Sequence, residues 1–134
     1  ASSLAASAIS KMATFTSDDT SPESLLPLPP ATFHILLAVA DQDRHGYAII
    51  QEVSARTAGE VRLSAGTLYR SIQKLVELDL IDETTERPAA DLDDERRRYY
   101  RISDFGRLVA RAEAERLQAL VQLARTCGLA PRRA

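Results

Sequence analysis

The stretch LSAGTLYRSIQKLVELDLI, residues 63 to 81, decides the fold of this 134-residue chain. Ser64 is a favoured N-cap residue, and apolar residues then recur at the spacing of one helical face. This apolar stripe consists of Leu68, Ile72 and Leu75, with Val76 extending it. The pattern predicts a helix that begins at Ser64 and ends near Asp79.

Polar residues on the other side of this helix make it a candidate binding element. They are Thr67, Arg70, Ser71 and Lys74, at i, i+3, i+4 and i+7, with no acid among them. Arginine reads guanine in the major groove, and hydroxyls contact bases or phosphate. The small side chains of Ser64, Ala65 and Gly66 leave the first amides of the helix open to a phosphate. The alternative is a solvated surface face.

Two helices are predicted before this segment. Residues 32 to 40 carry Phe33, Leu36 and Leu37 at helical spacing, and residues 41 to 44 form a polar break. A second helix is expected from Gly46 to Thr57, with Gly59 as a left-handed stop.

Two strands and a long helix are predicted after it. Residues 80 to 85 and 97 to 102 have the composition of strands and flank a charged loop that contains a proline. Ser103 caps a helix that runs to about Thr126, where Gly128 and Pro131 end it. This order predicts a mainly α (α+β) fold, a winged helix-turn-helix with an appended C-terminal helix.

The second strand carries cations beside aromatic residues. Alternation assigns Tyr100 and Ile102 to the core, leaving Tyr99 and the cations Arg97 and Arg101 outward. Arginines at the base of the wing, Arg96 and Arg98 among them, are candidates for phosphate or minor-groove contact. The alternative pairs these arginines with the loop acids Asp91, Asp93, Asp94 and Glu95. Because these acids repel DNA, we expect the wing tip to point away from a duplex.

The terminal helix carries a broad apolar stripe that predicts a dimer interface. Its residues are Phe105, Leu108, Val109, Ala112, Leu117, Leu120, Val121 and Ala124. Much of the remaining surface is polar, Glu113 and Arg116 included. A stripe of this length in a short chain is typical of packing against a partner helix. The alternative is packing within the chain, against the first helix and the N-terminal arm.

Composition excludes several classes of protein. The chain is 45% hydrophobic and 27% charged, with a formal net charge of −2. Its longest apolar run, residues 35 to 40, is far shorter than the roughly 18 residues of a membrane span. The single Cys127 supports neither a disulfide framework nor a metal cluster, so we expect a reduced, cytoplasmic protein.

No catalytic or metal-binding constellation is visible, and we predict neither an enzyme nor a cofactor. His34 flanks an apolar face and suits packing or the surface. His45 precedes a helix and suits capping. We expect Cys127 to be a small, buried hydrophobic residue, and a redox role is the alternative.

The predicted domains follow from these patterns. Residues 1–27 form an N-terminal tail or arm with a helical pattern around Leu4 to Met12, and prolines mark its end. Residues 28–102 form the winged helix-turn-helix, residues 103–127 the C-terminal dimerisation helix, and residues 128–134 a tail.

Four strings together resemble the PadR-like transcriptional regulators. They are HGY at 45–47, LSAGTLYR at 63–70, LI at 80–81, and RRYYRIS at 97–103 followed by Gly106. The resemblance covers roughly residues 28 to 126, and the single helix after the wing resembles the short subfamily. Asp79 stands where the family commonly has glycine, but aspartate can adopt the left-handed conformation. The N-terminal extension and acidic wing loop also depart from the family pattern.

The resemblance implies a homodimeric repressor that binds double-stranded DNA at an inverted-repeat operator. The implied contacts are Ser64, Gly66, Thr67, Tyr69, Arg70 and Lys74, with Arg97 and Arg98 assisting; the polar face adds Ser71. Tyr69 lies off the centre of that face, which suggests phosphate contact or packing. A small phenolic or drug-like apolar effector between the subunits is a further expectation, as is the absence of a membrane partner. The competing hypothesis is a winged-helix protein-interaction module that does not bind DNA.

Overall fold

The computed structural model describes residues 21–84 and 98–129. Within them the predicted helices and strands from residue 30 onward occur in the predicted order, and η3 and β2 are present in addition. The elements are η3 (Pro22–Leu25), α2 (Pro30–Ala40), β2 (Arg44–His45), α3 (Gly46–Arg56), α4 (Ala65–Glu77), β3 (Ile81–Thr84), β4 (Tyr99–Ile102) and α5 (Asp104–Thr126). The predicted winged helix-turn-helix with a long C-terminal helix is therefore confirmed. The segment around Leu4 to Met12, the acids of the loop at 91–95 and the tail from 130 lie outside the described residues.

The helices α3, α4 and α5 each begin at a side chain that caps the helix. The Ser64 hydroxyl accepts the Thr67 N–H at 3.1 Å, and the Ser103 hydroxyl accepts the Gly106 N–H at 2.9 Å. His45 caps α3 as expected, because its Nδ1 accepts the Ala48 N–H at 3.2 Å. Such caps satisfy N–H groups that have no partner within the helix.

Left-handed residues end two of these helices. Gly59 has φ +81° after α3, and Asp79 has φ +64° after α4. The Leu80 N–H then donates to the Leu75 carbonyl at 2.9 Å, which closes the end of α4. Aspartate therefore makes the turn that was predicted to remain feasible without glycine.

The sheet has three antiparallel strands in the order β2-β4-β3, with Ile81 opposite Ile102 and His45 opposite Tyr99. Strand β2 falls where a polar break was expected. Its presence corrects the prediction that Tyr99 points outward, because Tyr99 is only 5% exposed. The His45 ring lies edge-on to the Tyr99 ring with the centroids 5.4 Å apart, and so covers it.

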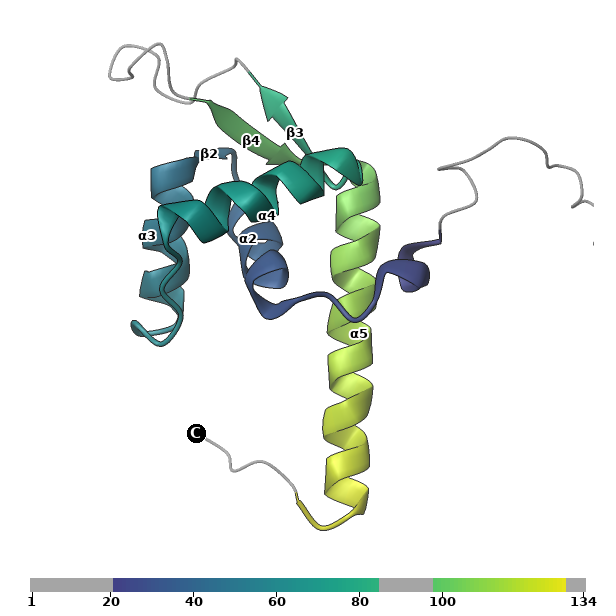
Figure 1. Cartoon of the computed structure of the whole chain (residues 1–134). Coiled ribbons are helices and arrows are strands. Elements are labelled where there is room, and N and C mark those ends of the chain that lie inside the picture. The colour runs from purple at the N-terminus through teal and green to yellow at the C-terminus, as the bar shows by residue number, and fades with distance from the viewer. Residues whose placement is uncertain (1–20, 85–97, 130–134) are drawn as a thin grey trace, which may run out of the picture.

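The core lies where α2 meets α3, α4, α5 and the sheet. Its most deeply buried side chains include Ile35, Leu36, Ile49, Leu68 and Leu75. In Figure 1, α4 crosses the front of the molecule with α2 behind it, and β3 and β4 rise above it. Val76, which was predicted to extend the apolar stripe of α4, is 39% exposed and lies outside this core.

Helix α5 has two different halves. In its first half Val109 is fully buried and Ala112 is 9% exposed, so both lie in the core of their own chain. A residue without exposed surface cannot contact a partner, and this corrects the assignment of Val109 to a dimer interface, whereas Ala112 keeps a small exposed fraction. The second half projects away from the rest of the molecule (Figure 1).

Glu113 was counted with the polar face of this helix, and the structure corrects that interpretation. It is 2% exposed, and its two carboxylate oxygens accept Arg116 Nε and Nη2 at 2.8 Å each. The Arg116 hydrogen bond, opposed by burial and assisted by the Leu28 N–H, holds the pKa of Glu113 below its ordinary value. Glu113 thereby fastens the chain segment before α2 to α5.

Two further findings concern expectations from composition. Cys127 is exposed, because it follows α5 at the projecting end, and the expectation of a buried cysteine is wrong. Within residues 21–84 and 98–129, no helix is both long and apolar enough to cross a bilayer.

Candidate nucleic-acid interface

The outer face of α4 is the strongest candidate for a binding surface. Leu68, Ile72 and Leu75 are at most 4% exposed and fix the inner face of the helix. The predicted contact residues on the rest of α4 differ in exposure. Gly66, Arg70 and Lys74 are exposed, whereas Thr67 and Ser71 are half-buried.

This pattern rotates the face relative to the sequence prediction. The residues opposite the buried stripe recur at i, i+4, i+7 and i+11, namely Gly66, Arg70, Gln73 and Glu77. Gln73 and Glu77 were not among the predicted contacts, yet both are exposed on this outer face. Because Glu77 belongs to it, the face is free of acids only over the first three turns of α4.

The electrostatic character of those three turns comes from Arg70 and Lys74. Neither forms an ion pair with any residue that the structure describes, and the nearest polar contact of Arg70 is Thr67 Oγ1 at 3.5 Å. Unpaired cations on an exposed helix are free to bind phosphate or a base edge.

The start of α4 is open. Ser64 occupies the Thr67 N–H, which leaves the N–H groups of Ala65 and Gly66 without an intrahelical partner. A Cβ placed on Gly66 meets only Arg70 Nη1, at 3.4 Å. An anion can therefore approach the backbone closely at this end, where the helix dipole favours negative charge.

Tyr69 packs between helices at the edge of this face. It is 50% exposed, and its ring lies so close to Gly46 that a Cβ there comes within 2.9 Å of Tyr69 Cζ and closer still to the hydroxyl. Of the two roles predicted for Tyr69, packing is the one that the structure describes. Gly46 lets α3 and α4 approach at this point.

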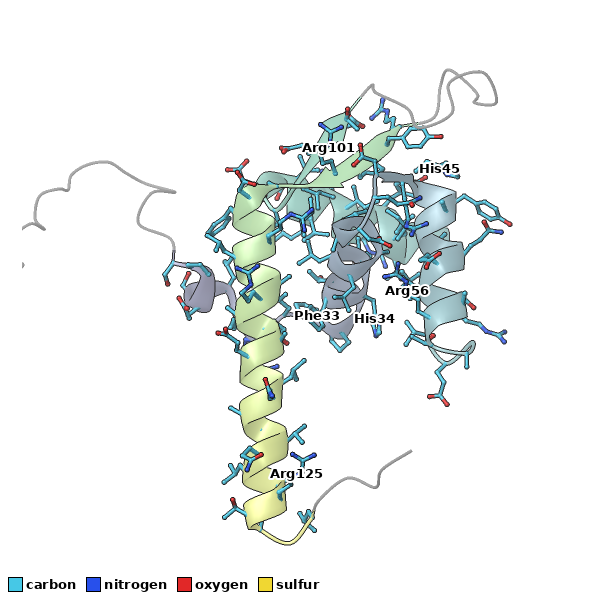
Figure 2. The ribbon with its side chains drawn as sticks, turned by 180° about the vertical axis from the view of Figure 1, so that it is seen from behind. Phe33, His34, His45, Arg56, Arg101 and Arg125 are labelled. Carbon is cyan, nitrogen blue, oxygen red and sulfur yellow. The ribbon has the colours of Figure 1, made fainter. Side chains whose placement is uncertain are left out.

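Two arginines set the angle between α2 and α3. Arg56 donates to the Leu37 carbonyl at 3.0 Å and to Glu52 and Asp41, and Figure 2 shows it between the two helices. Arg44 Nε donates to the Ala38 carbonyl at 2.6 Å. These contacts hold the end of α2 against α3, the helix on which α4 rests.

Of the arginines near the wing, Arg98 and Arg101 lie within the described residues, and both contact an acid. Arg98 is 72% exposed, and its Nη1 lies 3.2 Å from the Glu83 carboxylate across the strands. Arg101, labelled in Figure 2, makes a two-point ion pair with Asp43, with a shortest distance of 2.8 Å. An exposed pair such as Arg98–Glu83 contributes little to stability and can exchange for a phosphate. Arg97 lies outside the described residues.

The projecting half of α5 forms a second candidate surface. Its apolar residues Leu117, Leu120 and Val121 are 37%, 50% and 37% exposed, and Ala124 is half-buried. Leu108 is also exposed, at 49%, while Phe105 is half-buried and packs on the core. The predicted interface therefore divides into a part that the chain itself covers and a part that it leaves open.

Comparison with known proteins agrees with this geometry. The model of the transcriptional regulator PadR-like family matches residues 35–112, more than half of the chain. This chain belongs to the PadR-like family. Its members are transcriptional regulators rather than enzymes.

Solved structures of PadR-like regulators share the fold. One from Bacillus cereus has a TM-score of 0.62 at 18% identity, covering 75% of this chain and 93% of that one. One from Clostridium difficile has a TM-score of 0.60 at 18% identity, covering 73% and 97%. An uncharacterized protein from Lysinibacillus sphaericus is 36% identical over 74 residues, 54% of this PadR-like chain and 64% of the relative's length.

The site has no sign of metal chemistry. Among the described residues of this PadR-like protein, no three histidine, cysteine or acidic side chains gather in a way that holds a metal ion. The exposed polar groups on the first three turns of α4 are hydrogen-bond donors, acceptors and cations. They suit recognition of another molecule.

Proposed function

We propose that this protein is a dimeric, cytoplasmic transcriptional regulator that binds specific sequences of double-stranded DNA. The observation that carries the proposal is the outer face of α4 over its first three turns. It is exposed, lacks acids and presents Arg70 and Lys74, which form no ion pair with a described residue, beside an open helix start. In helix-turn-helix proteins the N-terminal part of such a helix contacts base edges in the major groove.

The proposed contacts divide into two kinds. Ser64, Gly66 and Lys74 lie where they suit phosphate, and Arg70 lies where it suits a guanine edge. Thr67 and Tyr69 line the flanks of this face. Ser71 is half-buried and turned toward the core side of α4, so it is not among the proposed contacts. Arg98, with Arg97, assists from the base of the wing once Glu83 is displaced by phosphate.

The proposed dimer uses the open half of α5. Leu117, Leu120, Val121 and Ala124, with Leu108 on the first half, present apolar surface that a second copy of the helix would bury. Two-fold symmetry then predicts an inverted-repeat operator whose half-sites lie about 34–36 Å apart. Light scattering on the purified protein tests the oligomeric state.

We extend the proposal to repression relieved by a small apolar or phenolic molecule held between the subunits. A ligand of this kind acts only if its affinity differs between the DNA-bound and free arrangements. Titrating phenolic compounds into the operator complex tests this extension. Compounds that bind while operator affinity stays constant would exclude them as effectors.

The experiment that tests DNA binding is selection of bound sequences from random duplexes, followed by affinity measurements over a salt series. We expect affinity to fall by about 0.9 log unit per phosphate contact for each log unit of salt. A second candidate, a protein-interaction module, is favoured by the net charge of −2 and by exposed Asp82 and Glu83 on β3. That function predicts no selected sequence at any salt concentration.

A further inference from the structure

The side of α4 that faces outward is set by the residues that the neighbouring elements cover. At about 100° per residue, the buried Leu68, Ile72 and Leu75 define an inner direction. Arg70 lies within about 15° of the opposite direction. Gln73 and Lys74 flank Arg70 on its two sides, each about 50° from that direction, whereas Ser71 is more than about 110° away.

The side chain of Gln73 is available to contact a DNA base. It is exposed, and its amide makes no hydrogen bond within the part of the chain that the structure describes. Figure 1 shows α4 across the front of the molecule, with no described element in front of it. The Gln73 amide therefore has both its donor and its acceptor available to a partner.

Chemistry separates Gln73 from Lys74, although both flank Arg70. The Lys74 ammonium is a compact charge that suits a phosphate. A neutral amide can donate to a phosphate but has no charge to attract one, whereas glutamine forms two hydrogen bonds with adenine, through N6 and N7. Arginine forms the corresponding pair with guanine O6 and N7.

The spacing along α4 places the two reading groups on neighbouring base pairs. Residues three apart are separated by about 4.5 Å along the helix axis. This distance approximates the 3.4 Å between successive bases of one strand. Glu77 lies about 10 Å beyond Arg70 along the axis, at the C-terminal end of α4 and away from the first turns that enter the groove.

We infer that Gln73 is a specificity-determining residue that reads an adenine next to the guanine read by Arg70, and that Ser71 reads no base. The inference rests on the proposed function, because it names what the α4 face recognises. Each half-site then contains adjacent guanine and adenine, and the identity of residue 73 sets the preference at the adenine.

The test is sequence selection from random duplexes with four proteins: wild type, Gln73→Ala, Gln73→Arg and, as a matched polar-to-small control on the same helix, Ser71→Ala. In the wild type we expect adenine to be preferred at one position by roughly 5- to 150-fold. Gln73→Ala abolishes the preference at that position alone, and Gln73→Arg changes it from adenine to guanine. Ser71→Ala leaves every preference in place.

Two results would overturn the inference while leaving DNA binding established: Gln73→Ala with an unchanged selected sequence, or Ser71→Ala with a lost base preference. A wild type that selects no sequence would instead refute the proposed function, and the inference with it. Thermal unfolding of all four proteins establishes that they are folded, which we expect because residue 73 is exposed.

Discussion

Replacing Gly66 with alanine should weaken DNA binding without lowering the stability of the folded protein. In the free protein the new methyl group meets only the end of the Arg70 side chain, which can move aside. Alanine is also a better helix former than glycine. In the DNA complex the same methyl group occupies space at the open start of α4, where we propose that a phosphate binds.

The structure sets the size of both effects. The new Cβ lies 3.4 Å from Arg70 Nη1, at the end of a flexible side chain, so the substitution costs no packing energy. It stabilises α4 by at most about 1 kcal/mol. On DNA, holding the phosphate away from the Ala65 and Gly66 amides removes a hydrogen bond to a charged group. Such bonds contribute about 1.5–3 kcal/mol, so we expect roughly 10- to 150-fold weaker binding.

Thermal unfolding and fluorescence anisotropy with a labelled operator measure these two quantities on the same sample. Gly106→Ala is the matched control, since a Cβ there collides with the Leu80 carbonyl and lies 2.9 Å from Ile102 Cγ1. Overpacking of this kind costs about 1–3 kcal/mol or more, so the control loses stability. Wild-type operator affinity in Gly66→Ala would refute the reasoning, because it would mean that the start of α4 does not face the duplex.

Three other predictions concern the cap, the dimer and the buried acid. Ser64→Ala removes the hydroxyl that accepts the Thr67 N–H, and it should lower the free energy of unfolding in urea by about 1 kcal/mol. Ser64→Asn should restore most of that stability. An equal loss of stability in both variants would contradict a capping role. Leu120→Asp should convert the dimer to a monomer in light scattering, whereas Gln118→Asp, on the opposite side of α5, should remain dimeric. If both variants are dimeric, the apolar surface of α5 is not the interface. Because folding lowers the pKa of Glu113, its contribution to stability is complete above the ordinary carboxyl value of 4.5 and is lost as the pH falls through the lower folded value. The stability difference between wild type and Glu113→Gln should therefore shrink from pH 6 to pH 3, and a constant difference would argue against this linkage.

The helix from Ser64 could be predicted because a cap and an apolar period agree there. Its outward direction could not. A polar run such as Thr67, Arg70, Ser71 and Lys74 shows where polar residues recur, but the direction that faces solvent depends on which side α2 and α3 cover. Thr67 and Ser71 are consequently half-buried, and Gln73 takes their place on the outer face.

Two other differences from the sequence prediction have the same kind of cause. Strand alternation assigned Tyr99 to solvent, but a two-residue strand is too short to leave a periodic signal, and His45 from that strand covers the tyrosine. Glu113 has the composition of a surface position. The chain around η3, far earlier in the sequence, packs on α5, and the Leu28 N–H donates to the Glu113 carboxylate. Helical spacing carries no information about such a partner.

The junction between α4 and α5 connects the two proposed surfaces. Ser103, the cap of α5, donates its hydroxyl to the Asp79 carbonyl at 2.6 Å and its N–H to the Leu80 carbonyl at 3.0 Å. The absence of a side chain at Gly106 lets α5 lie directly against Leu80, the residue that closes the end of α4. A close-packed junction with its backbone groups hydrogen-bonded transmits rotation instead of absorbing it. A change in how two α5 helices pack in the proposed dimer would therefore alter the separation of the two α4 helices, and an apolar molecule at that interface would change operator affinity without touching DNA.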